Sequence, residues 1–386
     1  MNRQKVDLLI RAGRVFCADT GLDGPGSVAI DGDRIVASGP DVVVDARQTL
    51  DFPDDLLLPG LIDLHAHPAP SDWYAGIAPD PFILARGTTT VLSQGDAGAD
   101  TWPLYQDTVI APTRLRILMA ISPVSQGAFA QTGRFEDLDN IDVESCVSTI
   151  REAGDAIWGI SVNTAVQVAG DSDPGEVLRR VLKAAEATGR PLLFGSRREP
   201  SDWPLAEQLA LLRPGDALTY CLHRGTDSGD ESIVKEGHAQ DAVWEARERG
   251  VLFDIGHGMM SFDFGVAEAI IAEGFLPDTI STDIQRRHVG LEPQHDMPLV
   301  MSKMIAAGMP ESQALMRATA NPAKAIGMSG EIGTLAPGAC ADLAVLRWDS
   351  DQTPLMDSAG VSRMGGRFEP VLTVRGGELV ADRRDQ

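Results

Sequence analysis

Short apolar segments alternate with amphipathic stretches through the middle of the chain, and this alternation most limits the possible folds. One amphipathic stretch has clear ends, because Asp173 is a candidate N-cap, Pro174 suits the first helical position and Gly189 can end the helix. Asn321 and Pro322 mark a second helix start. The eight apolar segments that we interpret as strands are residues 61–64, 88–93, 116–121, 157–162, 191–195, 217–221, 251–255 and 279–282. Eight such units predict an α/β fold, a (β/α)8 TIM barrel with its catalytic groups at the C-terminal strand ends.

An open doubly wound sheet is the competing architecture, since it also alternates strands and helices. Its dinucleotide-binding version loses support because no Gly-x-Gly-x-x-Gly follows the first strand. Both ends of the chain contain only strand and turn patterns. We therefore expect residues 1–59 and 335–386 to form a small β-sandwich domain built from both termini, around a catalytic barrel of residues 60–334.

The charge balance excludes some classes of partner. The chain has 33 basic and 56 acidic residues, a formal net charge of −23, whereas nucleic acids and anionic membranes both require basic patches. No apolar run approaches the roughly 20 residues of a membrane span, and the four cysteines show no paired spacing. We expect a cytoplasmic protein that binds neither nucleic acid nor membranes.

Three side chains at predicted strand ends suit a metal site. His65 and His67 end the first strand two residues apart, so both imidazoles point to the same face. Asp283 follows the eighth strand at the same barrel mouth, where a carboxylate can ligate metal and accept a proton from water. This set predicts one divalent metal ion, zinc, with manganese, iron or nickel as alternatives. The alternative roles are two structural histidines beside Pro68 and an N-cap aspartate, which Asp278 suits better.

Beyond these residues, nearly the whole chain resembles the amidohydrolase superfamily. The motifs that carry the resemblance are LPGLIDLHAHP, ARGTTTVLSQGDAGADTW, FDIGHGMMSFDF, ISTDIQ and NPAKAIGMSGEIGTLAPGACADLAVL. FEDLDNIDVESCVSTI is similar to the dihydroorotase-like branch of deacetylases and acyl-ester hydrolases. The resemblance implies a (β/α)8 barrel with a small β-sandwich, and one or two divalent metals that activate water against an amide, ester or cyclic amide.

The chain departs from the family pattern at three positions. Where binuclear members carry a carboxylated lysine on the fourth strand, this chain has Ser161. Gly195 and Tyr220 stand where the family has histidines on the fifth and sixth strands. The three replacements remove the protein ligands of one metal site together and spare those of the other. We therefore expect a mononuclear site.

The replacements suggest further roles. Tyr220 is a candidate catalytic residue that donates a proton or hydrogen-bonds a developing oxyanion, although it can equally fill the vacated volume. Arg197 and Arg198 can clamp a substrate carboxylate, as can the cluster Arg286, Arg287 and His288, or both groups can form surface salt bridges. His223 can act as a further ligand or lie in a surface loop. The candidate substrate-binding residues are His257, His223, Arg197 and Ser161.

We expect a metal-dependent hydrolase that cleaves an amide, cyclic amide or ester bond of a small, anionic substrate. One alternative is a lyase, decarboxylase or isomerase that uses the same pocket with Tyr220 as the acid. Another is a catalytically inactive binding homologue. The expected partners are a small-molecule substrate and further copies of the chain in a homo-oligomer.

Overall fold

Seven parallel strands form most of the barrel, in the order in which they follow along the chain. The computed structural model describes residues 3–70, 73–129, 134–198, 200, 202–226 and 228–384. The barrel strands are β5 (Leu61–Ala66), β6 (Thr88–Gln94), β7 (Arg116–Ile121), β8 (Ile157–Asn163), β9 (Leu192–Gly195), β10 (Ala217–Thr219) and β13 (Leu252–Phe253). Each lies within two residues of its predicted range, so these seven strand predictions are confirmed.

The eighth segment closes the cylinder without forming a regular strand. Thr279 bridges Asp254 after β13, and Ile284 bridges Ala66 of β5, both in parallel. The prediction of a continuous strand over 279–282 is wrong, because only these isolated bridges join the segment to its neighbours. Asp283, directly after it, adopts a left-handed backbone conformation with φ +48°. Its amide still donates to the carbonyl of His65 at 2.6 Å, so the segment lies against β5 at the C-terminal end of the barrel.

A buried carboxylate joins the first strand to this closing segment. Asp63 Oδ1 accepts hydrogen bonds from the amides of His65 at 3.1 Å and Thr282 at 3.0 Å. The Thr282 hydroxyl donates to Oδ2. Burial raises the pKa of Asp63 to about 7, against these hydrogen bonds. Asp63 therefore fixes the register in which His65 and Asp283 meet.

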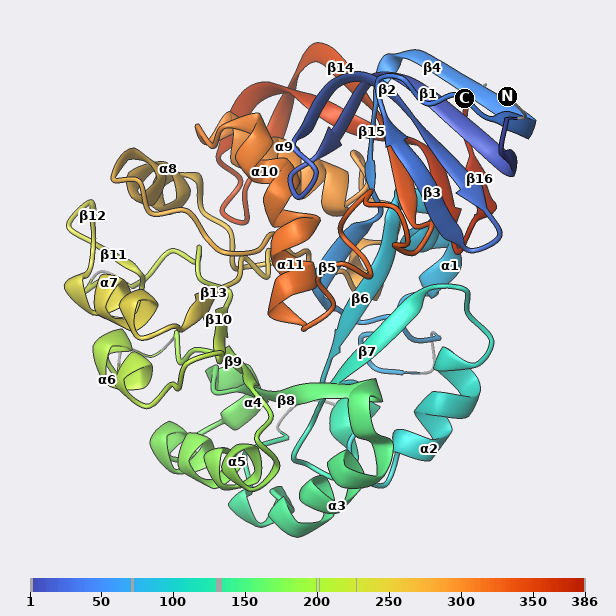
Figure 1. Ribbon diagram of the computed structural model, residues 1–386. Helices are drawn as coiled ribbons and strands as arrows, with labels where there is room; N and C mark the ends of the chain where they lie inside the picture. Colours follow the sequence, from blue (N-terminus) through green and yellow to red (C-terminus); the bar gives the residue numbers. More distant parts are fainter. Residues whose placement is uncertain are drawn as a thin grey trace.

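The helices lie around the outside of the strands (Figure 1). They are α1 (Pro79–Phe82), α2 (Trp102–Tyr105), α3 (Val143–Ala153), α4 (Val166–Ala169), α5 (Pro174–Thr188), α6 (Leu205–Ala210), α7 (Asp241–Glu248), α8 (Phe264–Ala272), α9 (Met297–Ala306), α10 (Glu311–Arg317) and α11 (Ala320–Ala325). The predicted ends of α5 are confirmed, since Asp173 accepts from the amides of Gly175 and Glu176 and Gly189 is left-handed. The predicted start of α11 at Asn321 and Pro322 is confirmed to within two residues, since Thr319 is the N-cap and the helix begins at Ala320.

The two ends of the chain share one seven-stranded sheet, in the order β16-β15-β14-β4-β1-β2-β3. Its strands are β1 (Lys5–Cys17), β2 (Leu22–Asp31), β3 (Arg34–Gly39), β4 (Asp45–Pro59), β14 (Leu343–Met356), β15 (Ser362–Arg375) and β16 (Glu378–Asp382). β1 and β4 pair in parallel and the other neighbours are antiparallel. Apolar residues from both ends, such as Ile10, Leu57, Val345 and Val374, pack into one core. The fold is therefore a (β/α)8 barrel with a β-sandwich domain built from both termini.

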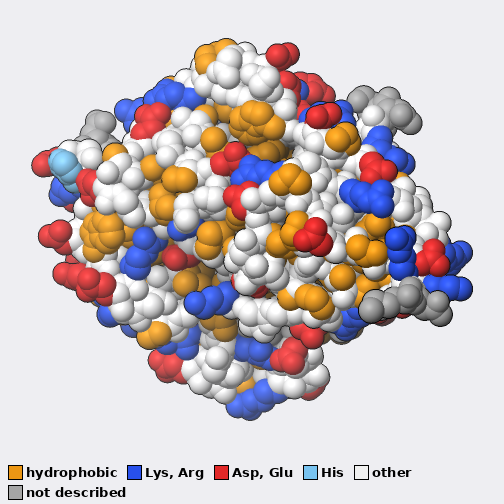
Figure 2. All heavy atoms as spheres, turned by 45° about the horizontal axis from the view of Figure 1, so that its top comes forward, with side chains coloured by type: hydrophobic (Ala, Val, Ile, Leu, Met, Phe, Trp, Pro, Cys, Tyr) orange, Lys and Arg blue, Asp and Glu red, His pale blue; other side chains and the backbone are white. Residues whose placement is uncertain are grey.

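Acidic and basic side chains are interspersed over the face drawn in Figure 2, and the hydrophobic ones are scattered among them.

Along the chain, a short hairpin of β11 (Val234–Lys235) and β12 (His238–Ala239) comes between β10 and α7. Within the described ranges, we find no helix that combines the length and apolar character needed to cross a bilayer.

Candidate metal centre and its cavity

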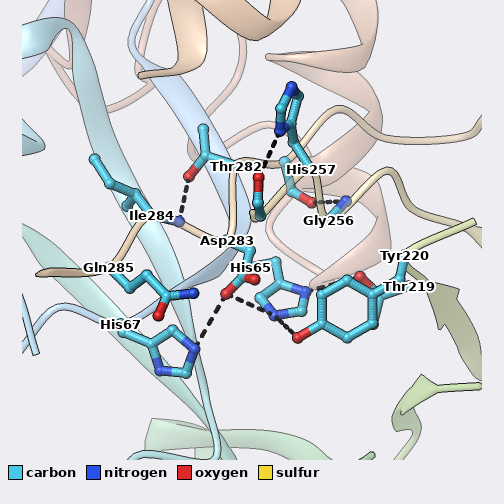
Figure 3. Close-up of polar contacts among 12 residues, drawn as sticks. His65, His67, Thr219, Tyr220, Gly256, His257, Thr282, Asp283, Ile284 and Gln285 are labelled. Carbon is cyan, nitrogen blue, oxygen red and sulfur yellow. Dashed lines mark hydrogen bonds and ion pairs between the residues drawn. The ribbon is translucent and has the colours of Figure 1, made fainter. Parts of the chain in front are cut away.

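Three predicted metal ligands converge at the barrel mouth. Oδ1 of Asp283 lies 3.5 Å from Nε2 of His65 and 3.2 Å from Nε2 of His67. Figure 3 shows the three side chains pointing toward one another, with the Tyr220 hydroxyl group beside His65. All three residues are buried, and their donor atoms lie within 4.8 Å of one another. Within the described part of the chain, this is the one group of three or more His, Cys, Asp or Glu with such spacing.

A second partner orients each imidazole. Nδ1 of His65 lies 2.7 Å from Oγ1 of Thr219, whose hydroxyl donates to Asp254 at 2.8 Å. Oγ1 must therefore accept from Nδ1–H, which leaves the Nε2 lone pair of His65 directed at the site. Nδ1 of His67 likewise lies 2.6 Å from the carboxylate of Asp96. Hydrogen bonds of this kind orient metal-ligating histidines and increase their basicity.

The electrostatics of the three groups differ. Burial lowers the pKa of His65 to about 4, although the Asp283 carboxylate opposes this shift. Burial also opposes protonation of His67, but Asp96 and Asp283 outweigh it and raise the pKa to about 10. Burial alone would raise the pKa of Asp283, yet the two imidazoles hold it below its usual value. The centre therefore combines the neutral imidazole of His65, the ionised carboxylate of Asp283 and the imidazole of His67, which lies between two carboxylates.

These residues fit a divalent cation. Oδ1 of Asp283 is buried and faces the Nε2 atoms of two imidazoles. A buried carboxylate oxygen in that position is costly unless a cation accompanies it. Two nitrogens and one oxygen are a donor set that zinc and other transition metals accept.

Two residues of the site have strained backbones. Tyr220 has φ +63° and Asp283 has φ +48°, and Glu236 is the one further non-glycine residue with positive φ in the described ranges. Such conformations cost about 1–3 kcal/mol each and persist where the surrounding structure holds them. The left-handed backbone of Tyr220 follows directly after β10, which ends two residues before its predicted end. The phenol is directed at His65, and its oxygen lies 3.1 Å from Nε2.

A cavity of about 310 Å³ opens beside the three predicted ligands. His67, Asp283 and Tyr220 form part of its wall. Three arginines, Arg134, Arg198 and Arg287, also line it, with Met259 and Met260 as apolar residues among its other neighbours. The guanidinium of Arg198 lies 4.3 Å above the Tyr220 ring. The cavity thus combines basic and apolar groups next to the metal centre.

The expected substrate-binding residues lie elsewhere. Arg197 pairs with Asp202 at 2.9 Å and donates to two backbone carbonyls, whereas its neighbour Arg198 takes the place at the cavity wall. Ser161 is buried against Gly95 and does not line the cavity. His223 is buried, with its pKa lowered to about 4 by burial, and it lines neither this cavity nor the metal group.

The expectation that His257 binds substrate beside these residues also needs correction, and Gly195 has close neighbours. A Cβ at Gly195 would lie 2.9 Å from Cγ of Asn163 and 3.0 Å from the Tyr220 ring. Tyr220 therefore fills the volume beside Gly195, and its hydroxyl also reaches the metal group. His257 points away from Asp283 (Figure 3) and lines a separate cavity.

The residues that orient the predicted ligands, and one arginine of the cavity wall, were not predicted from the sequence. Asp96 and Asp254 are carboxylates at the C-terminal ends of barrel strands, which is a signal that the sequence offered. Thr219 is recognisable only through its hydrogen bonds. Arg134 belongs to no motif in the sequence, so only the fold shows that it reaches the cavity.

Proteins of similar sequence belong to a family that agrees with this geometry. The profile of the amidohydrolase family matches residues 264–380. A deacetylase of Enterococcus faecalis is 28% identical over 379 residues, which cover 97% of this chain and 98% of that protein. A deacetylase of Brucella anthropi is 30% identical over 335 residues, covering 84% of this chain and 80% of that protein.

Two crystal structures have the same architecture. That of an adenine deaminase has a TM-score of 0.86 at 27% identity, covering 97% of this chain and 99% of the other. That of a dihydroorotase has a TM-score of 0.85 at 27% identity and covers 97% of both chains. The barrel, the terminal sandwich and the metal group together define a metal-dependent hydrolase. The chain belongs to the amidohydrolase family and is a hydrolytic enzyme.

Proposed function

We propose that the chain is a mononuclear hydrolase that removes an acyl group from an amide or ester of a small anionic molecule. The observation that carries the proposal is the convergence of His65, His67 and Asp283 beside Tyr220, with Ser161, Gly195 and Tyr220 at the positions of the second site. Relatives named deacetylases support acyl transfer to water. Zinc suits the donor set, and manganese, iron and nickel are alternatives.

A divalent ion held by these three residues would supply Lewis acidity toward the substrate and activate water. Asp283 stays ionised because the imidazoles lower its pKa, so it can accept the proton of the attacking water. Burial raises the pKa of Tyr220, so its phenol stays protonated and can donate to the carbonyl oxygen as negative charge develops. Asp283 then returns the proton to the leaving nitrogen or oxygen.

The cavity wall supports an anionic substrate. Arg134, Arg198 and Arg287 bring three guanidinium groups to a chain of net charge −23. A local basic patch in an acidic protein attracts anions and can bind a carboxylate with two parallel hydrogen bonds. Met259 and Met260 offer contact for an apolar part of the same molecule.

The proposal includes the organisation of the whole protein. Residues 60–334 form the catalytic domain, and residues 1–59 and 335–386 form the sandwich. We also propose a homo-oligomer. Exposed apolar side chains at the end of the β14–β15 hairpin support it, with Met356, Val361 and Met364 each 45% exposed or more.

The test combines metal analysis with product analysis. Elemental analysis of purified protein is expected to give one metal per chain, and chelation followed by reconstitution is expected to remove and restore turnover of N-acetylated or O-acetylated carboxylates. Solvent oxygen from labelled water should appear in the released acid. Full activity without metal, or in Asp283→Asn, contradicts the mechanism. Product without labelled oxygen would instead support a lyase, and two metals per chain would contradict the mononuclear site.

A further inference from the structure

A second cavity of about 230 Å³ lies on the other side of the Gly258–Met259 segment. Its nitrogen-bearing polar residues are His257, His288, His295 and Lys303, and its oxygen-bearing ones are Glu292, Asp357 and Ser358. Its apolar residues include Met259, Leu291, Leu299 and Met356. Met259 lines both cavities, so the two cavities are neighbours.

Lys303 brings a buried positive charge into this cavity. It lies on α9, is only 6% exposed, and places Nζ 2.9 Å from Nε2 of His257. Nδ1 of His257 lies 2.8 Å from the carbonyl oxygen of Gly258, to which it donates, so Nε2 accepts from the ammonium group. This hydrogen bond uses one of the three ammonium protons. Burial lowers the pKa of Lys303 to about 8, which leaves the group mostly charged at neutral pH.

The ammonium group has no close counter-ion. Among the residues that the structure describes, no carboxylate oxygen lies within 4.0 Å of Nζ. The nearby acidic groups, Asp357 and Asp296, already have donors: Asp357 accepts from the amides of Phe264, Ala359 and Val361, and Asp296 accepts from Arg86 and Leu299. Asp357 and Asp296 therefore compensate the buried charge of Lys303 only from a distance, and an incoming anion in contact with Nζ would compensate it further.

His288 adds a second donor to the same wall. The amide of Gln285 donates to Nδ1 at 3.0 Å, so the proton of the neutral ring lies on Nε2. Nε2 is buried and has no hydrogen-bond partner among the described residues. The ring stacks on His295 with centroids 4.0 Å apart, which fixes its position. His295 itself donates from Nε2 to the carbonyl of Thr282.

We propose that this cavity binds a small monocarboxylate, whose oxygens accept hydrogen bonds from Lys303 Nζ and His288 Nε2 while its hydrocarbon part contacts Met259, Leu291 and Met356. Two buried donor groups match the two oxygens of one carboxylate. The carboxylates of Glu292 and Asp357 also line the cavity and disfavour a dianion such as phosphate. The inference does not depend on the proposed hydrolysis, although acyl hydrolysis would release such an acid nearby.

The test measures binding of propionate to the full-length protein, both as purified and after chelation, by calorimetry and thermal unfolding. Saturable binding and a raised Tm are expected in both samples, and the neutral isostere propionamide should do neither. Lys303→Met should weaken propionate binding by about tenfold or more, because a charge-assisted hydrogen bond is lost. Lys183→Met, at an exposed position on α5, is the matched control and should bind as the wild type does.

Two further variants locate the binding. His288→Phe keeps a ring but removes the donor, so it should also weaken binding, and it replaces Lys303→Met if that variant does not fold. Arg198→Met alters the wall of the other cavity and should leave this binding unchanged. Equal affinity in wild type, Lys303→Met and His288→Phe overturns the proposal. It is also overturned if binding is lost only in Arg198→Met or is not saturable, or if inorganic phosphate binds more tightly than propionate.

Discussion

The phenol oxygen of Tyr220 lies 3.1 Å from Nε2 of His65, the nitrogen that also faces Asp283. Because Thr219 accepts from Nδ1–H, Nε2 carries a lone pair, and Tyr220 donates to it. One lone pair thus has two competing partners, the phenol and a metal cation. A cation that binds His65 should release the Tyr220 hydroxyl toward the substrate.

Tyr220→Phe should therefore bind the metal more tightly and turn over more slowly. Losing a hydrogen bond worth about 0.5–1.5 kcal/mol predicts about 2- to 10-fold higher metal affinity. Losing the donor to the developing oxyanion predicts that kcat falls by about 100-fold or more. Competition with a chromogenic chelator and steady-state kinetics measure the two effects. Tyr105→Phe is the control, since its hydroxyl donates to the carbonyl of Pro68. Weaker metal binding by Tyr220→Phe would show that the phenol itself ligates the metal.

Thr219→Val should weaken metal binding through His65. The variant removes the oxygen that orients Nδ1, and loss of such a partner costs about 10- to 100-fold in affinity. Thr279→Val is a matched control, because Thr279 also donates to Asp254, at 2.6 Å, but has no hydrogen bond to His65. Both variants should lower the free energy of unfolding by about 1 kcal/mol. Equal metal affinity in the two variants would contradict a positioning role for Thr219.

The sequence allowed prediction of the parts of the site that have local signals. His65, His67 and Asp283 follow predicted strands, and parallel strands of a barrel present their C-terminal ends to one mouth. Side-chain direction at strand exits was not predictable in the same way. Neighbouring residues on an extended chain point to opposite faces, so Arg198 reaches the cavity while Arg197 turns to Asp202. That choice depends on the backbone conformation after β9, which has no sequence signal of its own.

Arg198→Met should reduce activity selectively toward anionic substrates. The guanidinium lines the cavity, and losing a charge-assisted contact predicts about a tenfold or larger drop in the ratio of kcat/KM for anionic over neutral acyl substrates. Arg197→Met is the control, since that residue pairs with Asp202 outside the cavity. Arg197→Met should lower Tm and leave this kcat/KM ratio unchanged. A lower ratio in Arg197→Met but not in Arg198→Met would place the anion at Arg197.

Stability should rise with pH above 8 because of Lys303. Its pKa falls from 10.5 to about 8 on folding, so between these values the unfolded chain binds more protons than the folded one. The buried charge thus costs stability fully below pH 8, by about 3 kcal/mol at most, and this cost is lost as pH rises to 10.5. Denaturant unfolding from pH 7 to 10.5 should show this gain in wild type and lack it in Lys303→Met. A parallel pH profile in the variant would contradict the assignment.

The carboxylate of Asp63 and the paired amides of His67 and Asp283 hold together the two edges where the cylinder closes. The candidate metal centre has ligands from both edges, so an ion bound there would connect the first strand to the last segment. Without the ion, the barrel should open first along this joint. Amide hydrogens of His67 and Asp283 would then exchange with solvent earlier than those in the continuous ladder of β6 and β7. Metal loading would thereby control the mechanical integrity of the barrel as well as its chemistry.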